Sequence, residues 1–196
     1  MKESHHNLLE LTQEKDNIVI DLYYADTRNF TNKAVYKNKH CFAHQDLLEK
    51  FNIAKLQAQA LGLIFIVFDA YRPPAAQFIL WDHTPDPNFL ANPYLNGSAH
   101  SRGTAIDLNL IDAITKEPLD MGTKFDEFTE KSWHGNLDIS NQAQKNRLLL
   151  LGIMTAAGFD WYSHEWWHYQ LFGAKNYPLI EDHLLGQSNL MGGQKS

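Results

Sequence analysis

The chain has 196 residues, 20% of them charged, and a formal net charge of −6, which is typical of a soluble protein with one sizeable core. Its single cysteine, Cys41, excludes an internal disulfide and a zinc site built from several cysteines. No basic stripe indicates nucleic acid as a partner, and no apolar segment is long enough to act as a secretory signal or to span a membrane. With Met1 as the natural start we expect a cytoplasmic protein; a chain trimmed at a processing site would look the same and would be periplasmic.

The predicted elements alternate in type without the regular rhythm of a doubly wound fold, and no linker divides the chain. Helices are predicted where apolar residues recur at helical spacing, and strands where apolar and aromatic residues run together or alternate. We therefore expect one α+β domain over residues 1–196. In chain order the expected elements are a strand at 17–24, a helix at 45–61, a buried strand at 63–68, a short helix at 75–81, an ordered surface loop at 84–97, a half-buried strand at 104–110 that can continue as a hairpin to 119, a helix at 141–157 and a strand pair within 159–172.

Two sequence clusters offer the side chains of a catalytic zinc site. Residues 100–107 (His-Ser-Arg-Gly-Thr-Ala-Ile-Asp) provide an imidazole and a carboxylate, and residues 165–168 (Glu-Trp-Trp-His) provide a second imidazole and a spare glutamate. Zinc binds imidazole nitrogen and carboxylate oxygen and keeps a fourth position for a reactive water, whose proton a neighbouring carboxylate can accept. Gly103 permits a sharp backbone path that would bring His100 back toward Asp107.

Two alternatives stay open on the residues alone. The segment 164–168 also spells H-E-x-x-H, the zincin signature, in which His164 and His168 would be ligands and Glu165 again the base. The aromatic residues around it are equally typical of the edge of a hydrophobic core, in which His168 would be buried with its hydrogen bonds satisfied and would bind no metal. If the segment is a strand, it must bend, because residues three apart on a regular strand point to opposite faces.

These clusters closely resemble the zinc D-alanyl-D-alanine dipeptidases of the VanX type. The similarity extends in the same order through residues 21–31, 58–63, 68–73 and 121–126, so that it covers most of the chain. It implies a central, mainly antiparallel sheet flanked by helices. It also implies one zinc ion per chain, with His100, Asp107 and His168 as its ligands. Glu165 would be the general base and acid, and Arg72 would stabilise the oxyanion.

The same resemblance implies a small substrate with a free amino group. Asp126 would hold the substrate's ammonium group and so limit cleavage to very short peptides. Ser98 and Tyr71 are expected to complete the substrate pocket. On residue type alone, a solvated acid is the usual state of a residue such as Asp126, and an aromatic at a strand end such as Tyr71 is more often simply packed.

The sequence therefore predicts hydrolysis of D-Ala-D-Ala or a close D,D-dipeptide to free D-amino acids, in glycopeptide resistance or in salvage of D-alanine from the cell wall. One alternative is a D,D-carboxypeptidase or L,D-endopeptidase acting on peptidoglycan peptides, against which the absence of a secretion signal argues. Another is a zinc-bearing binding module without turnover, as in hedgehog-type signalling domains. Glu165 and Arg72 argue against that module, because a structural zinc site needs neither. Nothing in the sequence indicates the oligomeric state.

Overall fold

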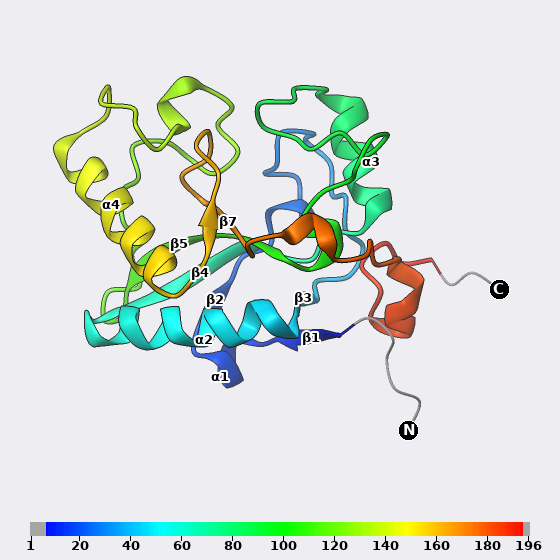
Figure 1. Cartoon of the computed structure of the whole chain (residues 1–196), viewed down its shortest axis with the longest axis horizontal. Helices are drawn as coiled ribbons and strands as arrows, with labels where there is room; N and C mark the ends of the chain where they lie inside the picture. The colour runs from blue at the N-terminus through cyan, green and yellow to red at the C-terminus, as the bar shows by residue number, and fades with distance from the viewer. Residues whose placement is uncertain (1–6, 194–196) are drawn as a thin grey trace.

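The structure, a computed structural model, describes residues 7–193 (Figure 1). The N-terminal residues on which the expected compartment depends lie outside this range. The helices are α1 (Gln13–Asp16), α2 (Gln45–Ala60), α3 (Pro74–His83) and α4 (Asn141–Ala156). The strands are β1 (Leu8–Leu11), β2 (Val19–Ile20), β3 (Cys41–His44), β4 (Leu63–Asp69), β5 (Ala105–Asp112), β6 (Asp160–Trp161) and β7 (His168–Gln170).

A five-stranded sheet organises the fold, in the order β2-β4-β5-β7-β6. Its neighbouring strands are antiparallel except for the parallel pair β2–β4. β1 and β3 pair antiparallel in a second, two-stranded sheet. The α+β class and the mainly antiparallel sheet are thus confirmed. No helix within residues 7–193 is long and apolar enough to cross a membrane.

The two long helices form where the sequence predicts them and pack beside the main sheet. α2 packs on β4, and α4 packs on α2 and β6 (Figure 1). Ser140 caps α4 by accepting a hydrogen bond from the backbone N–H of Ala143. Phe51 of α2 and Phe65 of β4 are fully buried, with ring centroids 5.1 Å apart. Burying each such side chain contributes about 2–3 kcal/mol, so this contact holds α2 against the sheet.

β5 is the central strand, and both of its faces are buried. Leu110 lies opposite Phe65 in the β4–β5 register and therefore shares the face that packs on α2. Asp107 points to the other face, because side chains alternate along a strand. There, Asn109 donates a hydrogen bond to the carbonyl of Leu119. The prediction of a half-buried strand was wrong, because segments without regular structure cover this second face.

Two predicted strand segments are shorter than expected. Residues 17–24 contain the two-residue β2 and then the start of a 3-10 turn, Tyr23–Ala25. After β5 the chain turns back through an isolated bridge between Ile111 and Pro118, so no hairpin strand forms in this stretch. The short helix α3 begins with Pro74 in its first turn, and residues 84–97 form a loop, both as predicted.

Candidate metal centre and active site

Three side chains from adjacent strands lie in one row on the face of the sheet opposite α2. Asp107 of β5 is the direct partner of Asp69 in β4 and of His168 in β7. A β-bulge between Val67 and Asp69 shifts the β4 register and turns Asp69 toward the face of Asp107. Directly opposed residues have close Cβ atoms, so the sheet itself brings Asp107 Oδ1 to 3.0 Å from His168 Nδ1.

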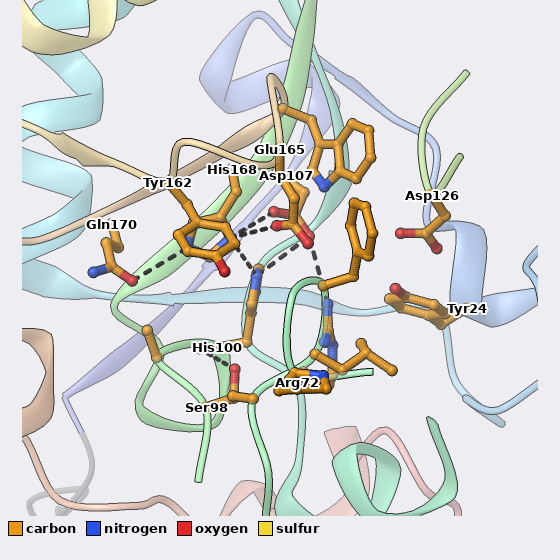
Figure 2. A pocket seen from close by; sticks show the side chains of 16 residues that line it. Tyr24, Arg72, Ser98, His100, Asp107, Asp126, Tyr162, Glu165, His168 and Gln170 are labelled. Atoms are coloured by element: carbon orange, nitrogen blue, oxygen red, sulfur yellow. Dashed lines mark hydrogen bonds and ion pairs between the residues drawn. The ribbon is translucent and has the colours of Figure 1, made fainter. Parts of the chain in front are cut away.

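His100 reaches the same row from a 3-10 turn, His100–Arg102, that precedes β5. Gly103 ends this turn with a φ of 67°, a left-handed conformation that glycine adopts readily, which agrees with the sharp path predicted there. The turn directs His100 Nε2 to 3.2 Å from Asp107 Oδ2 and to 3.2 Å from His168 Nδ1 (Figure 2). The two sequence clusters therefore converge on one point.

The donor atoms of His100, Asp107 and His168 fit a zinc ion. They all lie within 4.8 Å of one another, and the three residues are buried. Ligand atoms about 2.0–2.1 Å from a tetrahedral zinc lie about 3.3 Å apart, close to the 3.0–3.2 Å found between these atoms. Burial acts to raise the pKa of Asp107, but the two imidazoles outweigh it and hold that pKa well below its usual range. The set offers one carboxylate and two imidazole ligands and leaves the cavity side open for a fourth.

The outer nitrogens of both histidines have partners as well. His100 Nδ1 lies 2.7 Å from the carbonyl oxygen of Ala70, and His168 Nε2 lies 3.2 Å from Gln170 Oε1. When the inner nitrogens bind a metal, the outer nitrogens carry the protons and donate to these oxygens, which fixes each ring. Gln170 carries no sequence motif and was not predicted.

Replacing Gln170 by leucine is expected to weaken zinc binding about 10-fold, because His168 loses the acceptor that orients its ring. Competition with a chromogenic chelator measures this affinity directly. Gln142, an exposed glutamine on α4, provides the matched control: its replacement by leucine should leave the affinity unchanged. Equal zinc affinity in Gln170→Leu and wild type would show that Gln170 does not orient the ring.

Glu165 lies in a turn just before β7, and this turn supplies the bend that a regular strand lacks. The backbone N–H of His168 donates to the carbonyl of Glu165, and Glu165 Oε2 lies 3.8 Å from His168 Nδ1. Burial first, and then the charges of Asp107 and Asp126, raise the pKa of Glu165 well above its usual range. A carboxyl group of raised pKa beside a metal site is suited to accept a proton from water and to return it.

Arg72 is buried at the other end of the row, and each of its guanidinium nitrogens has a partner. Nε donates to Asp69 at 2.8 Å, Nη1 donates to Gln77 at 2.9 Å, and Nη2 lies 3.5 Å from Asp107 Oδ2. The guanidinium carbon lies 4.7 Å from the ring centre of Tyr24. Burial acts to lower the pKa of Arg72, but the acidic groups around it, first Tyr24 and Asp69, raise it well above its ordinary value. Arg72 is therefore a fixed positive charge beside the donor set.

A cavity of about 280 Å³ joins these groups to Asp126 and Ser98. Asp126 Oδ2 is buried and has no hydrogen-bond partner among the described residues. Burial, and then the charge of Asp107, raise the pKa of Asp126 to about 8. Ser98 Oγ accepts a hydrogen bond from the backbone N–H of His100 at 3.2 Å. The cavity is lined by Tyr24, Arg72, Pro87, Phe89, Leu90, Ala91, Ser98, Ala99, His100, Asp107, Asp126, Tyr162, Glu165, Trp167, His168 and Gln170 (Figure 2).

The structure brings every predicted site residue to this cavity except Tyr71. Tyr71 is 1% exposed and directs its hydroxyl to the carbonyl of Ile180 at 2.7 Å, so it packs in the core while its neighbour Arg72 faces the cavity. Its expected place in the substrate pocket is therefore corrected. Sequence reasoning missed Tyr162 and Phe89, because lining residues on irregular segments follow no spacing pattern.

His164 lies outside the donor set, contrary to the zincin alternative. Its ring stacks on Trp133 with centroids 4.4 Å apart, and its Nδ1 lies 3.2 Å from the Tyr162 hydroxyl. The segment 164–168 is a turn entering a strand, so the two histidines of H-E-x-x-H do not share a helical face.

Known proteins are similar in sequence to this chain over most of its length. A family model described as D-ala-D-ala dipeptidase, of the M15 peptidases, matches residues 4–186. The chain belongs to this family. D-alanyl-D-alanine dipeptidase of Escherichia coli K12 is 43% identical over 175 residues, which cover 89% of this chain and 90% of that protein. The proteins of the same name from Enterococcus faecium and Enterococcus faecalis V583 are 36% and 34% identical over 170 residues, covering 77% of this chain and 84% of each relative. These matches confirm the resemblance seen in the motifs. This member of the D-ala-D-ala dipeptidase family is therefore a peptidase, and the family is metal-dependent.

Proposed function

We propose that the chain is a zinc-dependent dipeptidase that hydrolyses D-Ala-D-Ala, or a close D,D-dipeptide, to free D-amino acids. One observation carries the proposal: a single confined cavity holds both the His-Asp-His donor set and the unpaired, buried oxygen of Asp126. The first suits the scissile bond and the second suits a free ammonium group. The names of the relatives support the choice of substrate, a cell-wall precursor.

Each of the site residues has a separate role in the proposed hydrolysis. His100, Asp107 and His168 would hold the zinc ion, which when bound would supply a Lewis acid for the scissile carbonyl and would lower the pKa of water. Glu165 accepts the proton of the attacking water and then delivers it to the leaving amine as the C–N bond breaks. Arg72 meets the negative charge that develops on the carbonyl oxygen.

Asp126 and Ser98 select the substrate in this scheme. The unpaired oxygen of Asp126 accepts a hydrogen bond from the ammonium group of a free N-terminus, and the carboxyl group releases its own proton to solvent to form the ion pair. A blocked or extended N-terminus would place a neutral amide there, which cannot form this ion pair. Ser98 presents a hydroxyl group at the cavity wall beside His100.

The deciding experiment measures amine release by the zinc-loaded protein from D-Ala-D-Ala, L-Ala-L-Ala, N-acetyl-D-Ala-D-Ala and a pentapeptide ending in D-Ala-D-Ala. Cleavage confined to the free D,D-dipeptide is the expected result. Cleavage of the pentapeptide instead would identify a D,D-carboxypeptidase. Zinc binding without cleavage of any peptide would favour the binding module.

Replacing Asp126 by asparagine is expected to stabilise the metal-free protein increasingly as pH rises from about 4 to about 8. The pKa of Asp126 is raised from 3.8 to about 8 on folding, so in this window the folded chain holds a proton that the unfolded chain has lost. Stability from this group is complete below the unfolded pKa and is lost as pH rises through the folded one, at up to about 1.4 kcal/mol per pH unit. Asparagine does not titrate and escapes this loss.

Urea unfolding of both proteins at pH 5 and pH 8, with a chelator present, measures this difference. Asp138→Asn, at a side chain that is 81% exposed, is the matched control and should show no such trend. A stability difference between Asp126→Asn and wild type that stays constant with pH would contradict the raised pKa of Asp126.

A further inference from the structure

Gln77 is a polar side chain on the inner face of α3, only 1% exposed, and the scheme above leaves it without a role. Both ends of its amide are engaged. Oε1 accepts a hydrogen bond from Nη1 of Arg72 at 2.9 Å, and Nε2 donates to the carbonyl of Ala91 at 2.8 Å. A buried polar group that is satisfied at both ends favours one arrangement of its partners, because any other arrangement leaves a buried group unpaired.

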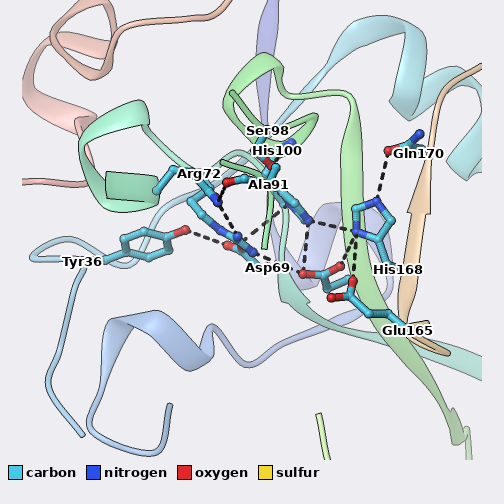
Figure 3. A network of polar contacts seen from close by, with 12 residues as sticks. Tyr36, Asp69, Arg72, Ala91, Ser98, His100, Glu165, His168 and Gln170 are labelled. Atoms are coloured by element: carbon cyan, nitrogen blue, oxygen red, sulfur yellow. Dashed lines mark hydrogen bonds and ion pairs between the residues drawn. The ribbon is translucent and has the colours of Figure 1, made fainter. Parts of the chain in front are cut away.

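The partners of Arg72 decide which of its nitrogens remains for the substrate. Nε is held by Asp69, which in turn accepts a hydrogen bond from the Tyr36 hydroxyl at 2.8 Å (Figure 3). Nη1 is held by Gln77. A guanidinium fixed at two nitrogens cannot rotate about its Nε–Cζ bond without breaking a hydrogen bond. Nη2 is thereby kept on the side of the donor set, 3.5 Å from Asp107 Oδ2.

The other end of Gln77 is anchored on the wall of the cavity. Ala91 belongs to the loop 84–97, whose residues Pro87, Phe89, Leu90 and Ala91 line the cavity. This loop has no helix or strand of its own to fix it. Gln77 therefore connects a rigid helix, the loop that forms the cavity wall and the guanidinium through a single amide.

We propose that Gln77 is a positioning residue that fixes the Arg72 guanidinium relative to the cavity wall at Ala91, so that Nη2 is already in place when the carbonyl oxygen becomes negative. The inference rests on the proposed hydrolysis, in which Arg72 stabilises that oxygen. A neutral amide suits the position, because Asp69 and Asp107 already place two carboxyl groups around the single positive charge. Glutamine orients the arginine without weakening its field at the substrate.

Gln77→Met tests this role, because methionine has a similar volume and makes neither hydrogen bond. It is expected to lower kcat about 10-fold and to change KM by less than about 2-fold, since the lost interaction acts in the transition state. In an Arg72→Ala background the same substitution is expected to change kcat by less than about 2-fold, because Gln77 acts through Arg72. An equal loss in both backgrounds would overturn the proposal.

Leu80→Val is the matched control for stability. Leu80 is fully buried on the same helix, and its hydrocarbon side chain cannot hold Arg72 by a hydrogen bond. This variant is expected to lower the melting temperature and to keep the wild-type kcat. A kcat loss in Leu80→Val as large as in Gln77→Met would show that a loosened α3 explains both, and would also overturn the proposal.

A second measurement does not depend on turnover. In spectra of protein labelled with ¹⁵N-arginine, Arg72 should give separate Nη1 and Nη2 signals in wild type, assigned by their loss in Arg72→Ala. Gln77→Met is expected to merge them by allowing rotation about Nε–Cζ, and unchanged signals would contradict the positioning role. If the wild type cleaves no D,D-dipeptide, the proposed function fails, whereas these spectra still decide whether Gln77 orients Arg72.

Discussion

Glu165→Gln is expected to lower kcat for the free D,D-dipeptide by about 10³-fold while zinc stays bound. Glutamine has the same shape as the buried carboxyl group but can neither accept the proton of water nor return it to the leaving amine. The metal should remain because Glu165 is not one of the three donors, and its nearest oxygen is 3.8 Å from His168 Nδ1. Loss of activity without loss of metal would mark a proton-transfer role.

Steady-state rates and the zinc content of the same preparation provide the measurement. Glu130→Gln, an exposed glutamate in a 3-10 turn, is the control and should match wild type in both. A Glu165→Gln enzyme that keeps more than about one tenth of the wild-type kcat would remove Glu165 from the role of general base.

Asp107→Ala is expected to weaken zinc binding by about 10³-fold and to abolish activity at ordinary zinc concentrations. The substitution removes the anionic member of the donor set and leaves two buried imidazoles without the carboxyl group that contacts both, a loss of about 4 kcal/mol. Zinc affinity measured by chelator competition, together with activity across a range of added zinc, separates weakened binding from a misfolded protein. Recovery of part of the activity at high zinc is expected.

His164→Ala is the counterpart to that experiment. His164 neighbours Glu165 and completes the H-E-x-x-H pattern, yet it stacks on Trp133 away from the donor set. The variant should bind zinc as tightly as wild type and keep most of its activity. The opposite result, with zinc lost in His164→Ala and retained in Asp107→Ala, would reinstate the zincin ligand set.

The long helices and central strands could be predicted because each follows from a local pattern. Apolar residues recur at helical spacing within 45–61 and 141–157, in each case up to a glycine, and residues 63–68 of β4 form an unbroken apolar run. The β1–β3 sheet was not predicted. β1 has two adjacent leucines and β3 is buried throughout, so neither strand shows the alternation that marks a strand with one exposed face.

The convergence of His100, Asp107 and His168 could be expected from the family resemblance of their motifs, but the geometry that produces it could not. The bulge in β4 and the turn at Glu165 depend on strand pairing between distant segments, which spacing does not encode. Gln77 and Gln170 escape sequence reasoning for a related reason. Each is an isolated glutamine whose importance comes from its partners, and Gln77 and its partner Ala91 are 14 positions apart.

The pairing of Asp107 in β5 with His168 in β7 makes bound zinc a measure of correct strand alignment. Asp107 and His168 face the same cavity only when β5 and β7 are paired in this register, and a slip of a single residue would turn one of these two donors to the opposite face of the sheet. In a refolded or heat-treated sample, the zinc bound per chain should therefore report the fraction with native strand alignment. Misaligned molecules would bind no zinc at this site, even when their helix content and their size are normal.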